Sequence, residues 1–393
     1  MVRMVRTSGI LACILALAVS ACATSIRPDG EAVSASATFG AIQLFNAEQK
    51  PLVPPPGATI AGTEVPFATR TKDLNVLAIS GGGSDGAFGA GVLKGWTQSG
   101  KRPNFNIVTG VSTGALIATF AFLGSAWDDE VERFYTQIKQ EQIYSDNGLF
   151  GLAQESLYDT APFRAMIEKA IDERLLDAVA EQHRAGRRLY VATTDLDSGT
   201  VVVWDMGGIA ASGHSSRVDT YRDVLVASAA FPGFFKPVYV RHSNEHGKAR
   251  MHVDGGVKAP ILLRSFMVEG PQKNKTVYML INGKLSLKTG DISPVPATVL
   301  GISKRSIAEL MRGLTYKTIY QAYVTTRQAR SQFRILHVPD DAHDIDDALR
   351  FRPKEMQQLF QVGRTIGGDP SNWKKEPPRL EPLERIEARG TVR

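Results

Sequence analysis

Three glycine-rich blocks in this 393-residue chain carry the residue types that acyl transfer requires. The first contains the triplet Gly81–Gly83, whose amides have no side chains that would block an approaching anion. The second has the form G-x-S-x-G around Ser112, and the third places Asp254 before two glycines. In this order the blocks offer donors for an oxyanion, a nucleophile and a base. The pattern therefore predicts acyl transfer through a serine.

Ser112 has the setting of a nucleophile on a strand-to-helix turn. An apolar strand expected at 105–108 precedes it, and an apolar helix expected at 115–123 follows it. Gly110 and Gly114 keep side chains away from the neighbouring strand and helix, so that the turn can expose the serine hydroxyl. The N-terminus of the helix favours developing negative charge. G-x-S-x-G alone is common, and its flanking elements give this copy its weight.

Asp254 ends a short strand, where it is suited either to a turn or to catalysis. Asp followed by Gly is a common turn dipeptide, so that taken alone the residue is typical of a turn. As a base at neutral pH it needs a raised pKa, because an ordinary Asp, with a pKa of about 3.9, binds protons weakly. If Asp254 is the base, we expect it to be partly buried beside Ser112, with a raised pKa.

A nucleotide-binding loop is the competing interpretation of the first glycine block. The chain satisfies G-x-G-x-x-G from Gly81 to Gly86, after a strand expected at 74–79. That pattern also requires an acidic residue about 20 positions further on, and 87–107 contains no Asp or Glu. A Walker loop fails as well, because Ala87-Phe88 stands where Lys and Ser or Thr are needed.

The elements that must position these blocks alternate between strands and helices. The run 74–79 ends in glycines and predicts a buried strand, and the small-residue segment 87–96 predicts a helix packed close to it. Such alternation predicts the α/β class, with a mostly parallel sheet wrapped by helices. Further strands are expected at 189–193, 201–204, 238–240, 249–253 and 277–281.

The longest expected helix, 304–330, carries an apolar stripe and a basic side. We expect the stripe to pack on the sheet, as amphipathic surface helices commonly do. A lid or a membrane-facing element is the alternative. The stripe consists of Ile307, Leu310, Met311, Leu314, Ile319 and Tyr323, and the basic side of Lys304, Arg305, Arg312, Lys317, Arg327 and Arg330.

A fourth block links these features to a known family. Residues 227–238 read A-S-A-A-F-P-G-F-F-K-P-V, and with the three glycine blocks, in order over about 74–256, the chain resembles the patatin-like phospholipases. The resemblance implies a single three-layer α/β/α domain that hydrolyses fatty acyl esters of membrane lipids without metal or organic cofactor. It also implies a Ser–Asp dyad of Ser112 and Asp254. The oxyanion donors that it implies are the amides of Gly81, Gly82 and Gly83.

One position departs from the family pattern. The family carries Arg or Lys where this chain has Asp85, and that cation would help to hold an anionic headgroup. The exchange leaves phospholipids, lysolipids and neutral esters open as substrates. It also leaves open a protein that binds lipid without turning it over.

A histidine base is the alternative to the dyad. Ser112, Asp254 and then His337 or His343 follow the Ser–Asp–His chain order of α/β-hydrolases. His337 ends an expected strand, although a structural or surface histidine is the commoner case. No metal site is expected from the remaining polar candidates, which lie in turn-rich segments: His242, His246, Asp195 and Asp197.

The N-terminus has the pattern of a bacterial export signal. Arg3 and Arg6 precede an apolar segment at 10–19, which is shorter than the roughly 20 residues of a spanning helix. The sequence Val-Ser-Ala-Cys ending at Cys22 resembles the lipobox of lipoproteins, whose cysteine is acylated and becomes the first mature residue. Ala23 favours the outer membrane in an enterobacterial-type sorting system. A simple secretory signal is the alternative.

These features predict four segments and limit the partners. The formal charge of +6 falls to about +4 once the two signal arginines are removed. A net charge this small does not indicate nucleic-acid binding, but it is compatible with an anionic membrane surface. With only Cys22 left after processing, no internal disulfide or cysteine metal site is expected. Nothing in the sequence indicates an oligomeric state. The segments are a signal peptide (1–21), a Pro-rich tether (22–70), the hydrolase domain (71–368) and an irregular tail (369–393).

Overall fold

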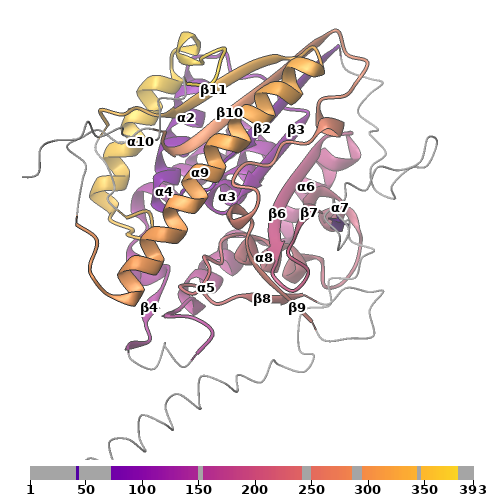
Figure 1. Ribbon diagram of the computed structural model, residues 1–393. Helices are drawn as coiled ribbons and strands as arrows, with labels where there is room; N and C mark the ends of the chain where they lie inside the picture. The colour runs from indigo at the N-terminus through magenta and orange to yellow at the C-terminus, as the bar shows by residue number, and fades with distance from the viewer. Residues whose placement is uncertain are drawn as a thin grey trace, which may run out of the picture.

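A nine-stranded mixed sheet forms the centre of the molecule (Figure 1). The computed structural model describes residues 41–43, 72–148, 154–240, 249–285, 294–342 and 347–378. The strands run in the order β1-β7-β6-β3-β2-β10-β11, with β9 paired to β6 and β8 to β9. They are β1 (Ala41–Gln43), β2 (Asp73–Ile79), β3 (Ile107–Val111), β6 (Arg188–Asp195), β7 (Thr200–Asp205), β8 (Val238–Val240), β9 (Arg250–Asp254), β10 (Asn274–Lys284) and β11 (Gln332–Val338). A separate small hairpin pairs β4 (Ser145–Asp146) with β5 (Tyr158–Asp159).

The middle of the sheet is parallel, as the alternation of elements predicts. Strands β6, β3, β2, β10 and β11 all pair in parallel, whereas β1, β7, β8 and β9 pair antiparallel. Every residue of β3 and β6 is buried, which explains why neither strand shows an alternation of apolar and polar residues. The α/β class and the mostly parallel sheet are confirmed.

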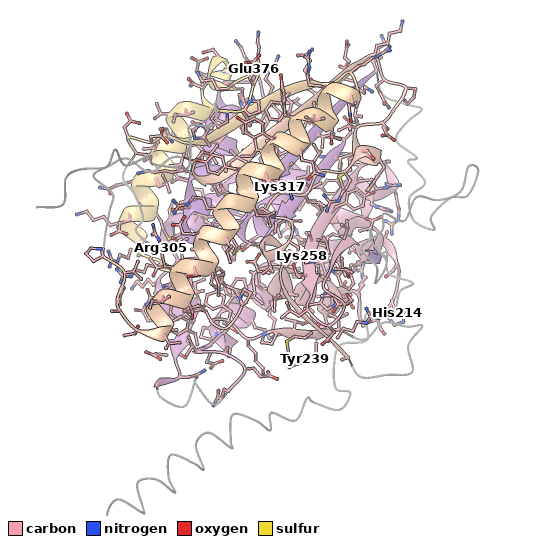
Figure 2. The ribbon with its side chains drawn as sticks, in the orientation of Figure 1. His214, Tyr239, Lys258, Arg305, Lys317 and Glu376 are labelled. Atoms are coloured by element: carbon pink, nitrogen blue, oxygen red, sulfur yellow. The ribbon has the colours of Figure 1, made fainter. Side chains whose placement is uncertain are left out.

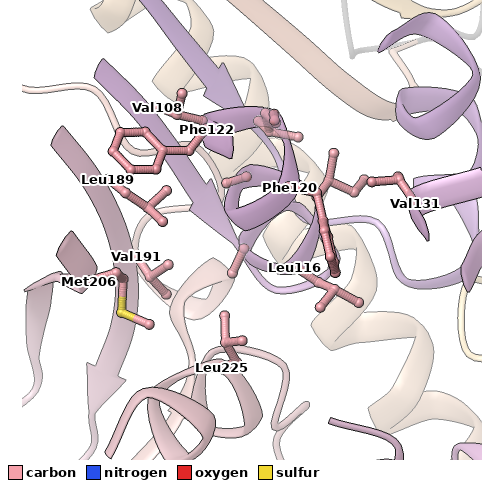
Figure 3. Close-up of a cluster of buried hydrophobic side chains, with 14 of the residues drawn as sticks. Val108, Leu116, Phe120, Phe122, Val131, Leu189, Val191, Met206 and Leu225 are labelled. Carbon is pink, nitrogen blue, oxygen red and sulfur yellow. The ribbon is translucent and has the colours of Figure 1, made fainter. Parts of the chain in front are cut away.

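Helices cover both faces of the sheet, and each face has its own apolar core. On one face α3 packs Leu116, Phe120 and Phe122 against Val108 of β3 and Leu189 of β6 (Figure 3). On the other face α9 crosses the sheet (Figure 1). The helices are α2 (Gly86–Gln98), α3 (Thr113–Leu123), α4 (Asp128–Gln137), α5 (Ala161–Ala170), α6 (Glu173–Arg184), α7 (Met206–Ala211), α8 (Arg217–Ser228), α9 (Val299–Gln328) and α10 (Pro353–Gly367). Short 3-10 turns are η3 (Gly83–Asp85), η4 (Ser125–Trp127), η5 (Gln140–Gln142), η7 (Gly255–Val257), η8 (Ser265–Met267) and η9 (Pro370–Asn372).

The long helix departs in part from its expected packing. In α9 the buried residues are Ile319, Ala322 and Thr326, all in the C-terminal half. Leu310, assigned to the packed stripe, is 74% exposed. The expectation of a stripe packed on the sheet is therefore right for the second half of the helix and wrong at Leu310 in the first half, where no α9 residue is fully buried.

The two ends of the domain also differ from the sequence prediction. Residues 41–43 of the predicted tether form β1, which pairs with β7. In the predicted irregular tail, Trp373 is buried against Trp96, and Lys374 bridges to Ile335. The indole is large enough to join the core although proline and charged residues surround it. The predicted signal peptide and Cys22 lie outside the described residues.

Candidate active site

Ser112 stands on a sharp turn between β3 and α3. Its backbone has φ 56° and ψ −129°, a left-handed conformation that L residues seldom adopt. The flanking glycines are required by space, because a Cβ at Gly110 would lie 2.3 Å from the Gly114 carbonyl oxygen, and one at Gly114 would lie 2.4 Å from that of Ser80. The strand-to-helix turn expected from G-x-S-x-G is present, and its strain exposes the hydroxyl.

Ser228, at the end of α8, links this turn to β6 by hydrogen bonds. Its hydroxyl accepts a hydrogen bond from the Ser112 amide at 2.9 Å and donates one to the Ala192 carbonyl at 2.8 Å. Sequence reasoning found the A-S-A-A-F-P block that contains Ser228 but gave the residue no role. The block's place in the four-block pattern was the available signal.

Strand β6 explains why Asp254 meets Ser112. Strand β7 occupies one edge of β6 from Tyr190 to Asp195, so β3 and β9 must share the other edge. On that edge Val111 of β3 lies opposite Ala192, and Asp254 of β9 lies opposite Thr193. Because β3 runs parallel and β9 antiparallel to β6, their carboxyl ends meet at two successive residues of one strand.

The Asp254 carboxyl group is buried and polarised by its neighbours. The residue is 2% exposed, and its Oδ1 accepts a hydrogen bond from the Gly256 amide at 2.7 Å. Burial raises the pKa of Asp254 to about 6, while hydrogen bonds from the Ser112 hydroxyl and the Gly256 amide act in the opposite direction. The raised pKa agrees with the expectation for a general base, although burial is nearly complete rather than partial.

The glycine loop runs beside Ser112. A Cβ on Gly81 would lie 3.8 Å from the Ser112 Oγ, so the loop passes directly beside the hydroxyl. The Gly81 amide donates to the Pro260 carbonyl at 3.2 Å, which corrects the expectation that Gly81 serves as an oxyanion donor. Among the described residues no acceptor is recorded for the amides of Gly82 and Gly83, whose φ values are 155° and 55°.

Asn282, near the end of β10, fixes the shape of this loop. Its backbone N–H donates a hydrogen bond to the Ser80 Oγ at 2.8 Å, and its side-chain Nδ2 donates one to the Ser80 carbonyl at 2.9 Å. A Cβ on Gly82 would come within 2.1 Å of the Asn282 carbonyl oxygen. Sequence reasoning missed Asn282, because it lies about two hundred residues further along the chain and belongs to no motif.

A large cavity opens in front of Ser112 and Asp254. It has a volume of about 690 Å³, and the loop residues Gly81 to Gly83 and Asp85 line it together with Ser112 and Asp254. Apolar side chains form much of the remaining wall, and they include Leu116, Phe134, Ile138, Phe163, Met166, Ile167, Leu225, Phe231 and Phe235. The site therefore combines a serine, a carboxyl group and unpaired amides with apolar space.

The histidine alternative receives no support from the described geometry. His337 is the second-to-last residue of β11 and lies opposite Ile281. It is not among the residues that line the cavity, and its Nδ1 lies 2.9 Å from the Val338 carbonyl oxygen. His343, His242 and His246 lie outside the described residues.

Asp195 and Asp197 serve the turn between β6 and β7, as expected. Asp195 Oδ1 accepts from the Asp197 amide at 3.0 Å, and its Oδ2 pairs with Arg250 at 2.9 Å. In the described ranges no group of three or more His, Cys, Asp or Glu side chains is arranged to hold a metal.

Comparison with known proteins adds to this geometry. Residues 77–267 match the model of a family described as patatin-like phospholipase. Patatin-T5 of Solanum tuberosum is 24% identical over 352 residues, which cover 78% of this chain and 87% of that protein. Residues 77–267 form a patatin-like phospholipase domain. The domain assigns the chain to the lipid acyl hydrolases, the enzyme class that the sequence predicts.

Two solved structures are also similar to the chain. VipD from Legionella pneumophila aligns with 12% identity and a TM-score of 0.36, over 75% of this chain and 67% of that chain. The type III effector protein ExoU aligns with 12% identity and a TM-score of 0.30, over 76% of this chain and 52% of that chain. Within the described part of the chain, no helix is both long and apolar enough to cross a bilayer.

Proposed function

We propose that the protein hydrolyses fatty acyl esters of membrane lipids through a Ser112–Asp254 dyad. Ser112 Oγ attacks the ester carbonyl while its proton passes to Asp254, and the amides of Gly82 and Gly83 stabilise the oxyanion. Asp254 then gives this proton to the departing alkoxide, which leaves an acyl-serine. Water attacks the acyl-serine with Asp254 again accepting the proton, and the fatty acid is released as Ser112 is restored.

The observation that carries this proposal is that the ends of β3 and β9 meet on β6, which brings Ser112 and the buried Asp254 carboxyl group to one apolar cavity. The raised pKa of Asp254 agrees with it. The cavity is suited to an acyl chain, and this is why we propose a lipid ester rather than a small polar ester as the substrate. Because Asp85 lines the cavity, the proposal does not specify the headgroup of the lipid ester.

Labelling with a fluorophosphonate tests the nucleophile. The wild-type protein should react, and Ser112→Ala should abolish the reaction. Asp254→Asn should slow ester hydrolysis by a factor of about 100 or more, as expected for loss of a general base. His337→Ala is the matched control and should retain activity. A protein that binds lipid vesicles but neither labels nor releases fatty acid would be a lipid-binding module instead.

We further propose that the enzyme is anchored to a bacterial envelope membrane, in the outer membrane, by acylation of Cys22. The support is the lipobox-like sequence that ends at this residue. Feeding cells an alkyne fatty acid should label the wild-type chain and leave Cys22→Ser unlabelled. Equal labelling of both would reject the anchor and leave the hydrolase proposal untouched.

A further inference from the structure

The first half of α9 forms a wall of the catalytic cavity. Gly301, Lys304, Ala308, Met311 and Thr315 line the cavity, and their spacing of three and four residues places them on one helical face. The same face continues along the helix through the residues that enter the core: Ile319, Ala322 and Thr326. One face of α9 thus lines the cavity in the first half of the helix and packs into the core in the second half.

The opposite face of this half is apolar and exposed. Val299 is 85% exposed, Ile302 55% and Leu310 74%, and none of the three lines the cavity. Of the seven large hydrophobic residues that are exposed in the described part of the chain, five lie between 295 and 310. Single exposed apolar residues are ordinary, but a cluster at the mouth of a substrate cavity marks an interaction surface.

The same segment is basic. Between 295 and 317 it carries one acid, Glu309, and four cations, of which Lys304, Arg305 and Arg312 line the cavity and Lys317 does not. Glu309 is shared by Arg305 at 2.8 Å and Arg312 at 3.2 Å, and Lys304 pairs with Asp347 of a neighbouring loop. Positive charge therefore remains, most openly at Lys317, which follows Arg305 along α9 in Figure 2. An apolar surface with cations fits an anionic bilayer.

We propose that the outer face of residues 295–317 rests on an anionic lipid bilayer and brings the cavity mouth to the substrate. The proposal rests on the lipid hydrolase function, since that function requires access to lipid. A second copy of the chain is a poorer occupant, because two copies of this face would bring their positive charges together.

Vesicle binding tests the surface without turnover. The full chain carrying Cys22→Ser and Ser112→Ala is mixed with vesicles of equal parts phosphatidylglycerol and phosphatidylcholine. Adding Val299→Asp, Ile302→Asp and Leu310→Asp should weaken binding about tenfold or more. Lys317→Gln should weaken it about fivefold on these vesicles and hardly at all on pure phosphatidylcholine. Leu196→Asp is the control, since Leu196 is 44% exposed but outside this segment, and it should bind normally.

A reporter residue localises the contact. The chain contains only two cysteines, Cys13 and Cys22, so both are replaced by Ser and a single Ile302→Cys is labelled with a polarity-sensitive dye. Vesicles should shift its emission to the blue, whereas the same dye at Leu196→Cys should not respond. Equal responses at both sites, or a dye shift that follows protein concentration without vesicles, would overturn the proposal.

Hydrolysis of a short water-soluble ester separates this proposal from the catalytic one. With Ser112 intact, the three Asp substitutions should leave that rate unchanged and slow only the hydrolysis of vesicle lipid. If the triple Asp variant hydrolyses the soluble ester normally and still binds vesicles as the wild type does, the proposed membrane surface is rejected and the catalytic proposal stands. Failure of the wild-type protein to hydrolyse any ester would reject the function, and the binding data would still report on the surface.

Discussion

The Ser112 amide donates a 2.9 Å hydrogen bond to the Ser228 hydroxyl, although 116 residues separate the two serines. This bond holds the strained turn of Ser112 against β6, because Ser228 also donates to Ala192. Ser228→Ala should lower kcat by roughly 10- to 100-fold, since small misplacements of a nucleophile are costly. Loss of the two bonds should also cost about 1–3 kcal/mol in the free energy of unfolding.

The control for this variant is Thr220→Val on the same helix. Thr220 is fully buried, and no hydrogen bond is recorded for its hydroxyl within the described structure. Its replacement should leave kcat unchanged and should not lower stability. Equal kcat values for Ser228→Ala and the wild type would show that the turn holds its shape without Ser228.

The pH dependence of hydrolysis should report the Asp254 carboxyl group. Burial raises its pKa to about 6, and only the ionised form accepts a proton from Ser112. For a soluble ester, kcat/KM should therefore be level above pH 6 and fall about tenfold per pH unit below it. A profile that stays level down to pH 4.5 would mean that another group is the base.

Asp254→Asn should stabilise the fold at neutral pH while it impairs catalysis. A folded pKa of about 6 lies above the ordinary value of 3.8, so the native state binds more protons than the unfolded chain between these values. Wild-type stability consequently falls as pH rises through this window, by up to about 3 kcal/mol. Urea unfolding should find the variant more stable than the wild type at pH 8 and about equal to it below pH 4.

The amides of the glycine loop should matter for kcat rather than for KM. Asn282→Ala removes the Nδ2 bond to the Ser80 carbonyl, and Gly82→Ala forces a Cβ against the Asn282 carbonyl oxygen. Both changes should lower kcat about 100-fold or more, as loss of an oxyanion donor does. Gly313→Ala on α9 meets nothing within 4 Å and should leave hydrolysis of a soluble ester unchanged.

The apolar wall of the cavity should limit the length of the acyl chain. Met166 on α5 lines the cavity and is partly exposed, so a larger side chain there can be accommodated at the expense of the cavity. Met166→Trp should keep the hydrolysis of short esters and reduce that of long-chain esters at least tenfold. A matching loss for all chain lengths would indicate that the acyl chain lies elsewhere.

Local sequence patterns were sufficient to predict the main strands and helices and the order of the motifs. Gly110 and Gly114 predict the turn at Ser112 because only glycine fits where the strand meets the helix. Apolar runs predict the strands, since a strand buried on both faces needs no alternation. Local patterns failed where distant packing decides the outcome, as for Leu310, which remains exposed, and Trp373, which joins the core.

The tertiary structure alone decided which of these groups lie next to one another. The sequence pairs Ser112 with Asp254 only through the family resemblance, and the shared edge of β6 is what brings their strand ends together. The fold also engages the Gly81 amide in a hydrogen bond to the Pro260 carbonyl, and it places Asn282 where its side chain supports the glycine loop. Hydrogen bonds between distant segments have no local spacing rule, so these relationships appear only once the chain has folded.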